Sequence, residues 1–220
     1  MDYLFSQAGA EQLLRWLHFF FGVVWIGTLY YFNFIQGEFF KEAEAATKSN
    51  MIQKQLPRAL DWFRYGALWT FVSGALILAI RGANITDTLF VGVLLGTLMF
   101  LNVWLIIWPN QKIVIASTSQ VAQGGAALPE AAAAGPKALL ASRTNVMFSL
   151  AMLFFMGAGA HLPFGMFDLT AIDLWIAVAL IAALEVNALK GKLGPLTTVK
   201  GVIHCGVALT LVLLAVLAFI

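Results

Sequence analysis

The sequence predicts an all-α fold, a polytopic integral membrane helical bundle of about six transmembrane helices with both termini outside. Hydrophobic residues make up 61% of the 220 residues, charged residues only 11%, and the mean hydropathy is +0.87. A soluble domain is less apolar and more highly charged than this. Six segments are long enough to cross a bilayer core, which needs about 20 apolar residues per helix. Lysine and arginine also gather in alternate loops.

The six spans form a single transmembrane domain over residues 1–220. They are predicted, in chain order, at residues 12–35, 63–80, 88–110, 144–161, 171–190 and 199–220. The first span is expected to be retained, because acidic residues rather than a basic segment precede it. Glycines and prolines scattered among the alanines of residues 119–142 predict a flexible cytoplasmic linker. No fixed period relates the two halves of the chain.

Loop charge gives the predicted orientation. The connections after spans 1, 3 and 5 hold nearly all the basic residues: Lys41, Lys48, Lys54, Arg58, Arg64, Lys112, Lys137, Arg143, Lys190, Lys192 and Lys200. The opposite side keeps only Arg15 and Arg81. By the positive-inside rule the three basic connections are cytoplasmic and both termini are outside. The formal charge of +2 is spread over loops and predicts no nucleic-acid partner. The lipid bilayer is the expected partner.

Two histidines stand at the ends of long apolar runs. His18 follows the start of span 1 and His161 ends span 4, which places both near the outer surface, with His18 about 9 Å below it at 1.5 Å per residue. Gly22 and Gly157 lie four residues away, each deeper on the face of its histidine. His204 begins span 6 on the cytoplasmic side and is not an easy partner for either.

This pattern predicts that His18 and His161 are metal ligands, as the axial pair of a haem b whose flat ring rests on the two glycines. Arg15 and Arg81 are the expected partners of the haem propionates. Two other interpretations stay open: packing histidines bonded to backbone or lipid headgroups, and a proton path. Zinc and copper sites commonly add thiolates, and the single cysteine, Cys205, lacks the CxxCH spacing of a covalent haem.

Three separated motifs resemble one family. LLRWLHFFFGVVWIGTLYYFNFIQ (12–35), NVWLIIWPNQKIVIA (102–116) and SRTNVMFSLAMLFFMGAGAHLP (142–163) are similar, in the same order, to the membrane part of the bacterial membrane-bound urate oxidases, the urate oxidase N-terminal domain. The similarity runs through spans 1–4, and only the general character continues over spans 5 and 6. The resemblance implies a multi-span helical domain in the bacterial plasma (inner) membrane that carries haem.

The family resemblance also bears on residues and partners. It marks His18 and His161 as functional positions, with weaker polar members Asn102, Asn110, Arg143 and Asn145. A c-type cytochrome usually follows the membrane domain in that family, whereas this sequence ends at Ile220 inside a span. A separate cytochrome c, or a larger respiratory or photosynthetic complex, is therefore the expected electron partner.

Two functions follow from these features. The first is a membrane haem b redox protein acting in electron transfer or, as an oxidoreductase, in the oxidation of urate or another small molecule. The alternative is a non-catalytic accessory transmembrane subunit of a respiratory or photosynthetic complex. Glu185 is the one acidic residue well inside a span, which makes it a functional candidate. Its proximity to Lys190 and the inner surface also fits a merely solvated carboxylate.

Overall fold

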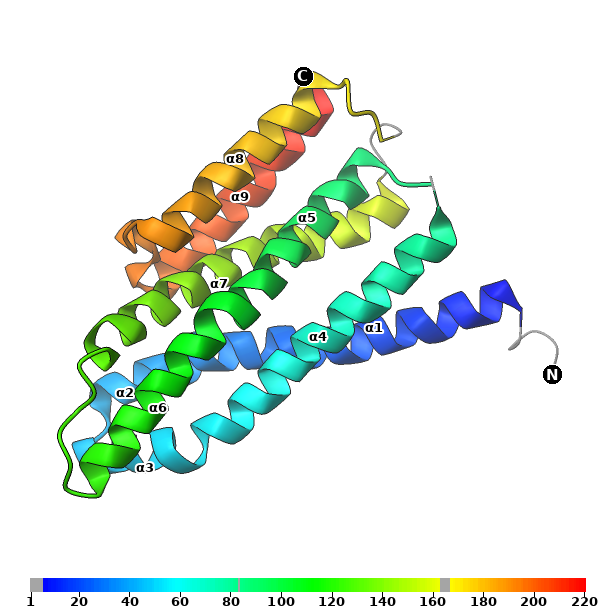
Figure 1. Cartoon of the computed structure of the whole chain (residues 1–220). Helices are drawn as coiled ribbons and strands as arrows, with labels where there is room; N and C mark the ends of the chain where they lie inside the picture. The colour runs from blue at the N-terminus through cyan, green and yellow to red at the C-terminus, as the bar shows by residue number, and fades with distance from the viewer. Residues whose placement is uncertain (1–5, 83, 163–166) are drawn as a thin grey trace.

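A computed structural model describes residues 6–82, 84–162 and 167–220 and confirms the all-α fold (Figure 1). Six of its helices are long and apolar enough to cross a membrane, so the chain is a multi-pass membrane protein. The elements are α1 (Gln7–Tyr30), η1 (Tyr31–Gln36), α2 (Gly37–Glu42), α3 (Ala45–Lys54), α4 (Leu56–Arg81), α5 (Asp87–Leu101), η2 (Asn102–Ile107), α6 (Trp108–Ala122), α7 (Ala131–His161), α8 (Ile172–Lys190), η3 (Gly194–Thr197) and α9 (Val199–Phe219). Both η1 and η2 are π-helical, and η3 is a 3₁₀ turn.

Two of the membrane helices are longer than their predicted spans. The elements α1, η1 and α2 form one continuous helix over Gln7–Glu42, and α5, η2 and α6 form another over Asp87–Ala122. A helix of 36 residues is about 54 Å long at 1.5 Å per residue, against about 30 Å for a hydrocarbon core. Polar residues gather toward the C-terminal end of each. These ends therefore project from the membrane on the side of the basic connections.

The linker prediction for residues 119–142 was wrong over most of its length. Helix α6 continues to Ala122 and α7 begins at Ala131, so only residues 123–130 are not helical. Alanine has the highest helix propensity of all residues, and here it outweighs the neighbouring glycines. Pro136 lies within the first two turns of α7. Proline has no backbone N–H, but the loss of this one donor does not end the helix here. Helix α6 also packs against α7, which supports this part of the chain.

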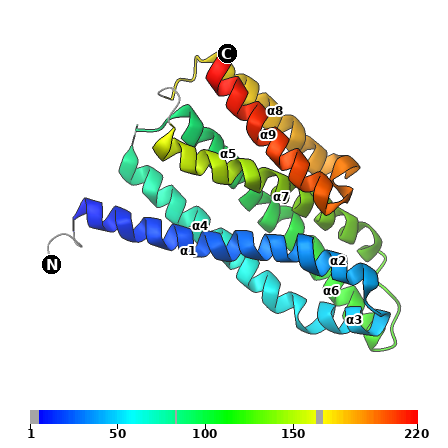
Figure 2. The ribbon, with the colours of Figure 1, turned by 180° about the vertical axis from the view of Figure 1, so that it is seen from behind.

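The long helices alternate in direction, as six spans joined by short connections require. The basic connections, between α2 and α4, between α6 and α7, and between α8 and α9, lie at one end of the molecule (toward the left in Figure 1). The start of α1 and the end of α9 lie at the opposite end in both views (Figure 2). Which end faces outward is still a prediction.

Glycines set the closest helix approaches, as is common in membranes. Helix α1 packs mainly on α4, and α7 packs on both α5 and α9. A Cβ on Gly66 of α4 would lie 3.0 Å from the backbone nitrogen of Trp25 in α1. A Cβ on Gly92 of α5 would lie 3.0 Å from the backbone nitrogen of Met156 in α7. A residue larger than glycine at either crossing would require the neighbouring backbone to shift.

Replacing Gly66 with valine should force α1 away from α4. Overpacking of a filled interface costs about 1–3 kcal/mol. Gly27→Val is the matched control, because Gly27 lies on α1, the other helix of the same pair. A Cβ added to Gly27 would have no neighbouring atom of another helix within 4 Å among the described residues. Thermal unfolding in detergent should show a lower midpoint for Gly66→Val than for Gly27→Val. Equal midpoints would contradict the close crossing of α1 and α4.

The two longest helices share a short motif with similar local structure in each. GTLYYFN (27–33) and GTLMFLN (96–102) have glycine, threonine, leucine and asparagine at the same four positions. The hydroxyl of Thr28 donates to Val24 O at 2.7 Å, and that of Thr97 donates to Val93 O at 2.8 Å. A π-helical segment begins within each motif. Both helices therefore depart from α-geometry close to the shared asparagine.

A second shared motif lies in the helices that follow. PRALDWFR (57–64) in α4 and PKALLASR (136–143) in α7 each place an arginine seven residues after a proline. The first motifs lie 69 residues apart and the second motifs 79 residues apart, because a longer stretch of chain separates the two motifs in the second hairpin. This unequal spacing hides the similarity from a search for a fixed period. The hairpins α1–α4 and α5–α7 therefore resemble each other in sequence and order.

Candidate functional site

His18 is half-buried on α1, where its ring faces α4. Its Nδ1 lies 2.9 Å from the carbonyl oxygen of Thr70 and 3.2 Å from Oγ of Ser73. A carbonyl can only accept a hydrogen bond, so this network assigns the proton to Nδ1. Nε2 then keeps its lone pair. Histidines that bind metals are oriented in this way, with the second ring nitrogen donating to a carbonyl or carboxylate.

The polar side chains on the α4 side of this contact are hydrogen-bonded within their own helix. The hydroxyl of Thr70 donates to Gly66 O at 2.7 Å, and the hydroxyl of Ser73 donates to Trp69 O at 2.6 Å. Both side chains are buried and lie about one helical turn apart. The carbonyl of Thr70 is thus part of a fixed helix surface, which holds the imidazole in one orientation.

Gly74 makes room for the imidazole. A Cβ on Gly74 would lie 3.0 Å from Cε1 and 3.3 Å from Nδ1 of His18. Any larger residue here would meet the ring. Gly22 stands farther from α4, since its Cβ would be 3.9 Å from Cγ2 of Thr70. The glycine against the histidine therefore comes from the neighbouring helix, 56 residues away in sequence, and the sequence pattern did not single it out.

His161 and Gly157 lie on α7. His161 is the last residue of the helix and is exposed. Gly157 is also exposed, and a Cβ added to it would have no neighbouring atom of another helix within 4 Å among the described residues. Helices α1 and α7 meet where Tyr30 Oη and Ser149 Oγ are 2.9 Å apart. His18 and His161 are each twelve residues from this contact, toward the same end of the molecule. Each is thus about 18 Å along its helix from the contact.

The structure therefore places the two histidines equally far along their helices from this contact but does not bring their side chains together. Among the described residues, no hydrogen bond joins them, and no cluster of three or more His, Cys, Asp or Glu side chains could hold a metal ion. Arg15 is exposed and pairs with Glu11 at 2.5 Å, and Arg81 is half-buried at the last position of α4. His204 is exposed on α9.

A second polar site, the Asn102 cluster, lies inside the bundle and consists of Met99, Asn102, Asn145 and Glu185. Nδ2 of Asn102 donates to Oδ1 of Asn145 at 3.0 Å and to Oε2 of Glu185 at 3.1 Å. Nδ2 of Asn145 donates to Met99 O at 2.9 Å. Both asparagines are buried and Glu185 is half-buried. The cluster links η2, α7 and α8 at the start of a π-segment, which is a frequent location of functional sites.

The other helix with a π-segment meets α7 through similar contacts. Nδ2 of Asn33 in η1 donates to Leu29 O at 2.9 Å and to Oγ of Ser142 at 2.8 Å. Beside it, Arg143 is 4% exposed and pairs with Glu38 at 3.6 Å, while its Nη1 has no hydrogen-bond partner in the described parts of the chain. Arg143 thus connects α7 to α2 instead of lying only at a membrane surface.

Asn110, the remaining weaker candidate, donates to Ile106 O within its own helix at 2.7 Å. This bond satisfies its amide locally, so the structure gives Asn110 no link to either polar site.

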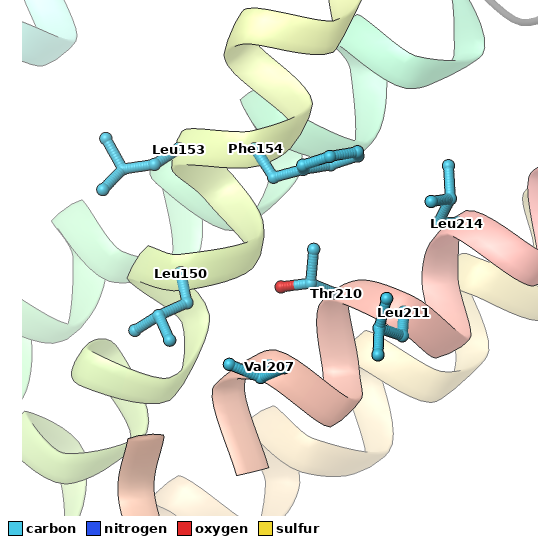
Figure 3. Close-up of a pocket in the computed structure, with 7 residues that line it drawn as sticks. All are labelled: Leu150, Leu153, Phe154, Val207, Thr210, Leu211 and Leu214. Atoms are coloured by element: carbon cyan, nitrogen blue, oxygen red, sulfur yellow. The ribbon is translucent and has the colours of Figure 1, made fainter. Parts of the chain in front are cut away.

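A groove of about 360 Å³ lies between α7 and α9 (Figure 3). Its lining is Leu150, Leu153, Phe154, Val207, Thr210, Leu211 and Leu214. The one hydroxyl in this lining, on Thr210, already donates to Gly206 O at 2.8 Å. The groove therefore offers a surface for apolar groups and no free donor for a polar ligand.

The comparisons with known proteins give one family. A model of the family described as urate oxidase N-terminal matches residues 79–190, just over half of the chain. The match runs from the end of α4 to the end of α8 and includes His161, Asn102, Asn145 and Glu185. It leaves out α1 and therefore His18. No curated protein and no solved structure matches the chain.

Proposed function

The chain belongs to the urate oxidase N-terminal family, and from this premise we propose that it is a haem b redox protein in which His18 and His161 would hold the iron. A bound haem supplies one-electron exchange between ferric and ferrous iron. The membrane would be the plasma membrane of a bacterium. Electrons would come from urate or another small molecule and leave to a cytochrome c or a larger respiratory or photosynthetic complex.

The observation that carries the proposal is the orientation of His18. Thr70 O accepts from Nδ1, which leaves Nε2 as a ligand of fixed direction. Gly74 removes the side chain that would displace the ring. The donor set fits an iron porphyrin, which needs only one or two protein ligands, better than zinc, which commonly needs four.

Three further features support the proposal without fixing its geometry. His18 and His161 are each twelve residues along their helices from the contact between Tyr30 and Ser149. Arg15 and Arg81 lie on the same end of α1 and α4 as His18, where propionates would need cations. Gly157 is open at its Cβ position and Gly22 makes only an ordinary van der Waals contact there, so both leave room for a ring edge.

An absorption spectrum of the purified protein tests the proposal. Oxidised and reduced samples should show a Soret band that shifts on reduction, and solvent extraction should release non-covalent haem. A protein without a Soret band and without extractable haem, recovered in fixed stoichiometry with a larger complex, would overturn the proposal. That outcome would favour the accessory subunit.

Replacing Gly74 with valine tests whether the orientation of the His18 ring matters for haem binding, because this variant keeps the histidine itself. The added side chain would occupy the place of Cε1 and Nδ1 and turn the imidazole away from Thr70. The haem-to-protein ratio should fall several-fold in Gly74→Val and stay near the wild-type value in Gly27→Val, whose site is open. Equal ratios in both variants would show that Gly74 does not position the ligand.

A further inference from the structure

We propose that Glu185 is a proton-binding site that exchanges its proton with the aqueous phase on the side of the basic connections. The proposal concerns the Asn102 cluster, which is remote from His18 and does not depend on haem. A carboxyl inside a membrane-spanning segment is costly when it is ionised and is found mainly where it has a function.

The hydrogen bonds of Glu185 fit both protonation states and favour neither strongly. Its one partner among the described residues is the neutral amide of Asn102, 3.1 Å from Oε2. That amide is held in place because it also donates to Asn145, whose own amide is bound to Met99 O. An ionised Glu185 carboxylate would therefore accept one hydrogen bond from a neutral amide. A protonated Glu185 can accept the same bond through its carbonyl oxygen, so protonation removes little hydrogen-bond energy.

Charged groups near Glu185 do not fix its state by an ion pair. On α8 itself the nearest is Lys190, five residues on, and Asp173 lies near the other end of the helix. Helices α5, α7 and α9 pack against α8, and each carries titratable groups. Those of α7 are Lys137, His161 and Arg143, and Arg143 is paired with Glu38. Those of α9 are Lys200, His204 and Cys205, and that of α5 is Asp87. Within the part of the chain that the structure describes, no cation lies within 4 Å of the Glu185 carboxylate.

Glu185 lies close to the end of α8 that faces the basic connections (Figure 1). It lies five residues before the end of α8, about 7.5 Å along the helix axis. Asn187, two residues closer to this end, is half-buried, and its amide donates to Lys192 O at 3.2 Å in the connection to α9. His204 lies five residues after the start of α9, so it has a similar depth on the neighbouring helix. Polar groups therefore continue from Glu185 toward the basic connections.

Infrared spectroscopy of the protein in lipid nanodiscs tests the proposal. Between about pH 5 and about pH 9, above the ordinary pKa range of exposed glutamates, a protonated-carboxyl C=O band should disappear as the pH rises. Glu185→Gln should remove this band and keep the hydrogen bond with Asn102. Glu42→Gln, which changes an exposed glutamate at the end of α2, should leave it unchanged.

The carboxyl band and its loss in Glu185→Gln decide the proposal. A band that survives in Glu185→Gln, or a wild-type spectrum with no carboxyl band that titrates in this range, would overturn it. A shift of the titration in His204→Gln would extend the proton path to α9, and an unchanged titration would confine it to Glu185 and α8. The haem content of the same samples is read independently from the Soret band, so failure of the haem proposal is distinguishable.

Discussion

His18→Ala should abolish haem binding. The substitution removes Nε2, the nitrogen that the contact with Thr70 leaves as a ligand, and α1 carries no second histidine to replace it. The purified variant should lose nearly all of its Soret absorbance while keeping its helical circular dichroism. Because His18 is only half-buried and bonded through Nδ1, the fold should tolerate its loss.

His204→Ala is the matched control. His204 is exposed on α9, and the predicted depth separates it from the other two histidines. Its haem-to-protein ratio should equal that of the wild type. Loss of haem from the His204 variant, with retention in the His18 variant, would reverse the assignment. Adding imidazole to the His18 variant should restore part of the Soret band, which a merely misfolded protein would not do.

The second large effect is expected from Asn145→Leu, which should destabilise the fold. Leucine has the branched shape of asparagine but cannot hydrogen-bond, so Met99 O loses its side-chain donor and Asn102 loses an acceptor. Single interhelical hydrogen bonds in membranes average only about 0.6 kcal/mol. Asn102 keeps its bond to Glu185, and Met99 O still accepts the backbone N–H of Asn102, so neither partner is left unpaired. The expected loss is that of two buried side-chain hydrogen bonds, about 1 kcal/mol in total.

The measurement is unfolding in mixed micelles by a denaturing detergent. Asn145→Leu should unfold at a clearly lower detergent fraction than the wild type. Asn84→Leu, at an exposed position whose amide donates to Arg81 O at 3.3 Å, should change the midpoint little. If the two variants unfold together, the Asn102 cluster contributes nothing measurable to stability.

The membrane topology was largely predictable, because long apolar runs of about 20 residues have few alternatives in a bilayer. Helix ends outside the membrane were not. The predicted first span stopped at residue 35, whereas the helix continues to Glu42, and the predicted fourth span began at 144, whereas α7 begins at Ala131. Hydropathy detects the part of a helix that lies in lipid, while alanine-rich and charged turns beyond it form helix without an apolar signal.

The candidate sites depend on contacts between helices, which one sequence does not give. His18 was visible as a polar residue in an apolar run, but its partners Thr70, Ser73 and Gly74 are more than 50 residues away. Glu185 was visible as an intramembrane acid, yet its pairing with Asn102 joins α8 to η2. Identifying either set of partners required the fold.

The His18 site and the Asn102 cluster occupy different parts of the bundle and are tested by different measurements. His18 and its α4 contacts lie in the half nearer the chain termini, and the Asn102 cluster lies nearer the basic connections. In our proposals the first holds a haem iron and the second a proton. A haem protein whose Glu185 does not titrate, or a titrating Glu185 in a protein without haem, would each leave one proposal standing.

Pulsed electron paramagnetic resonance of the ferric protein at low temperature tests most directly whether a histidine nitrogen of α1 binds a haem iron. Wild-type protein should give a low-spin signal with hyperfine coupling to two histidine nitrogens. His161→Ala should convert it to a form with one histidine nitrogen, that of His18. An iron signal without histidine coupling, or one that persists unchanged in His18→Ala, would contradict the account.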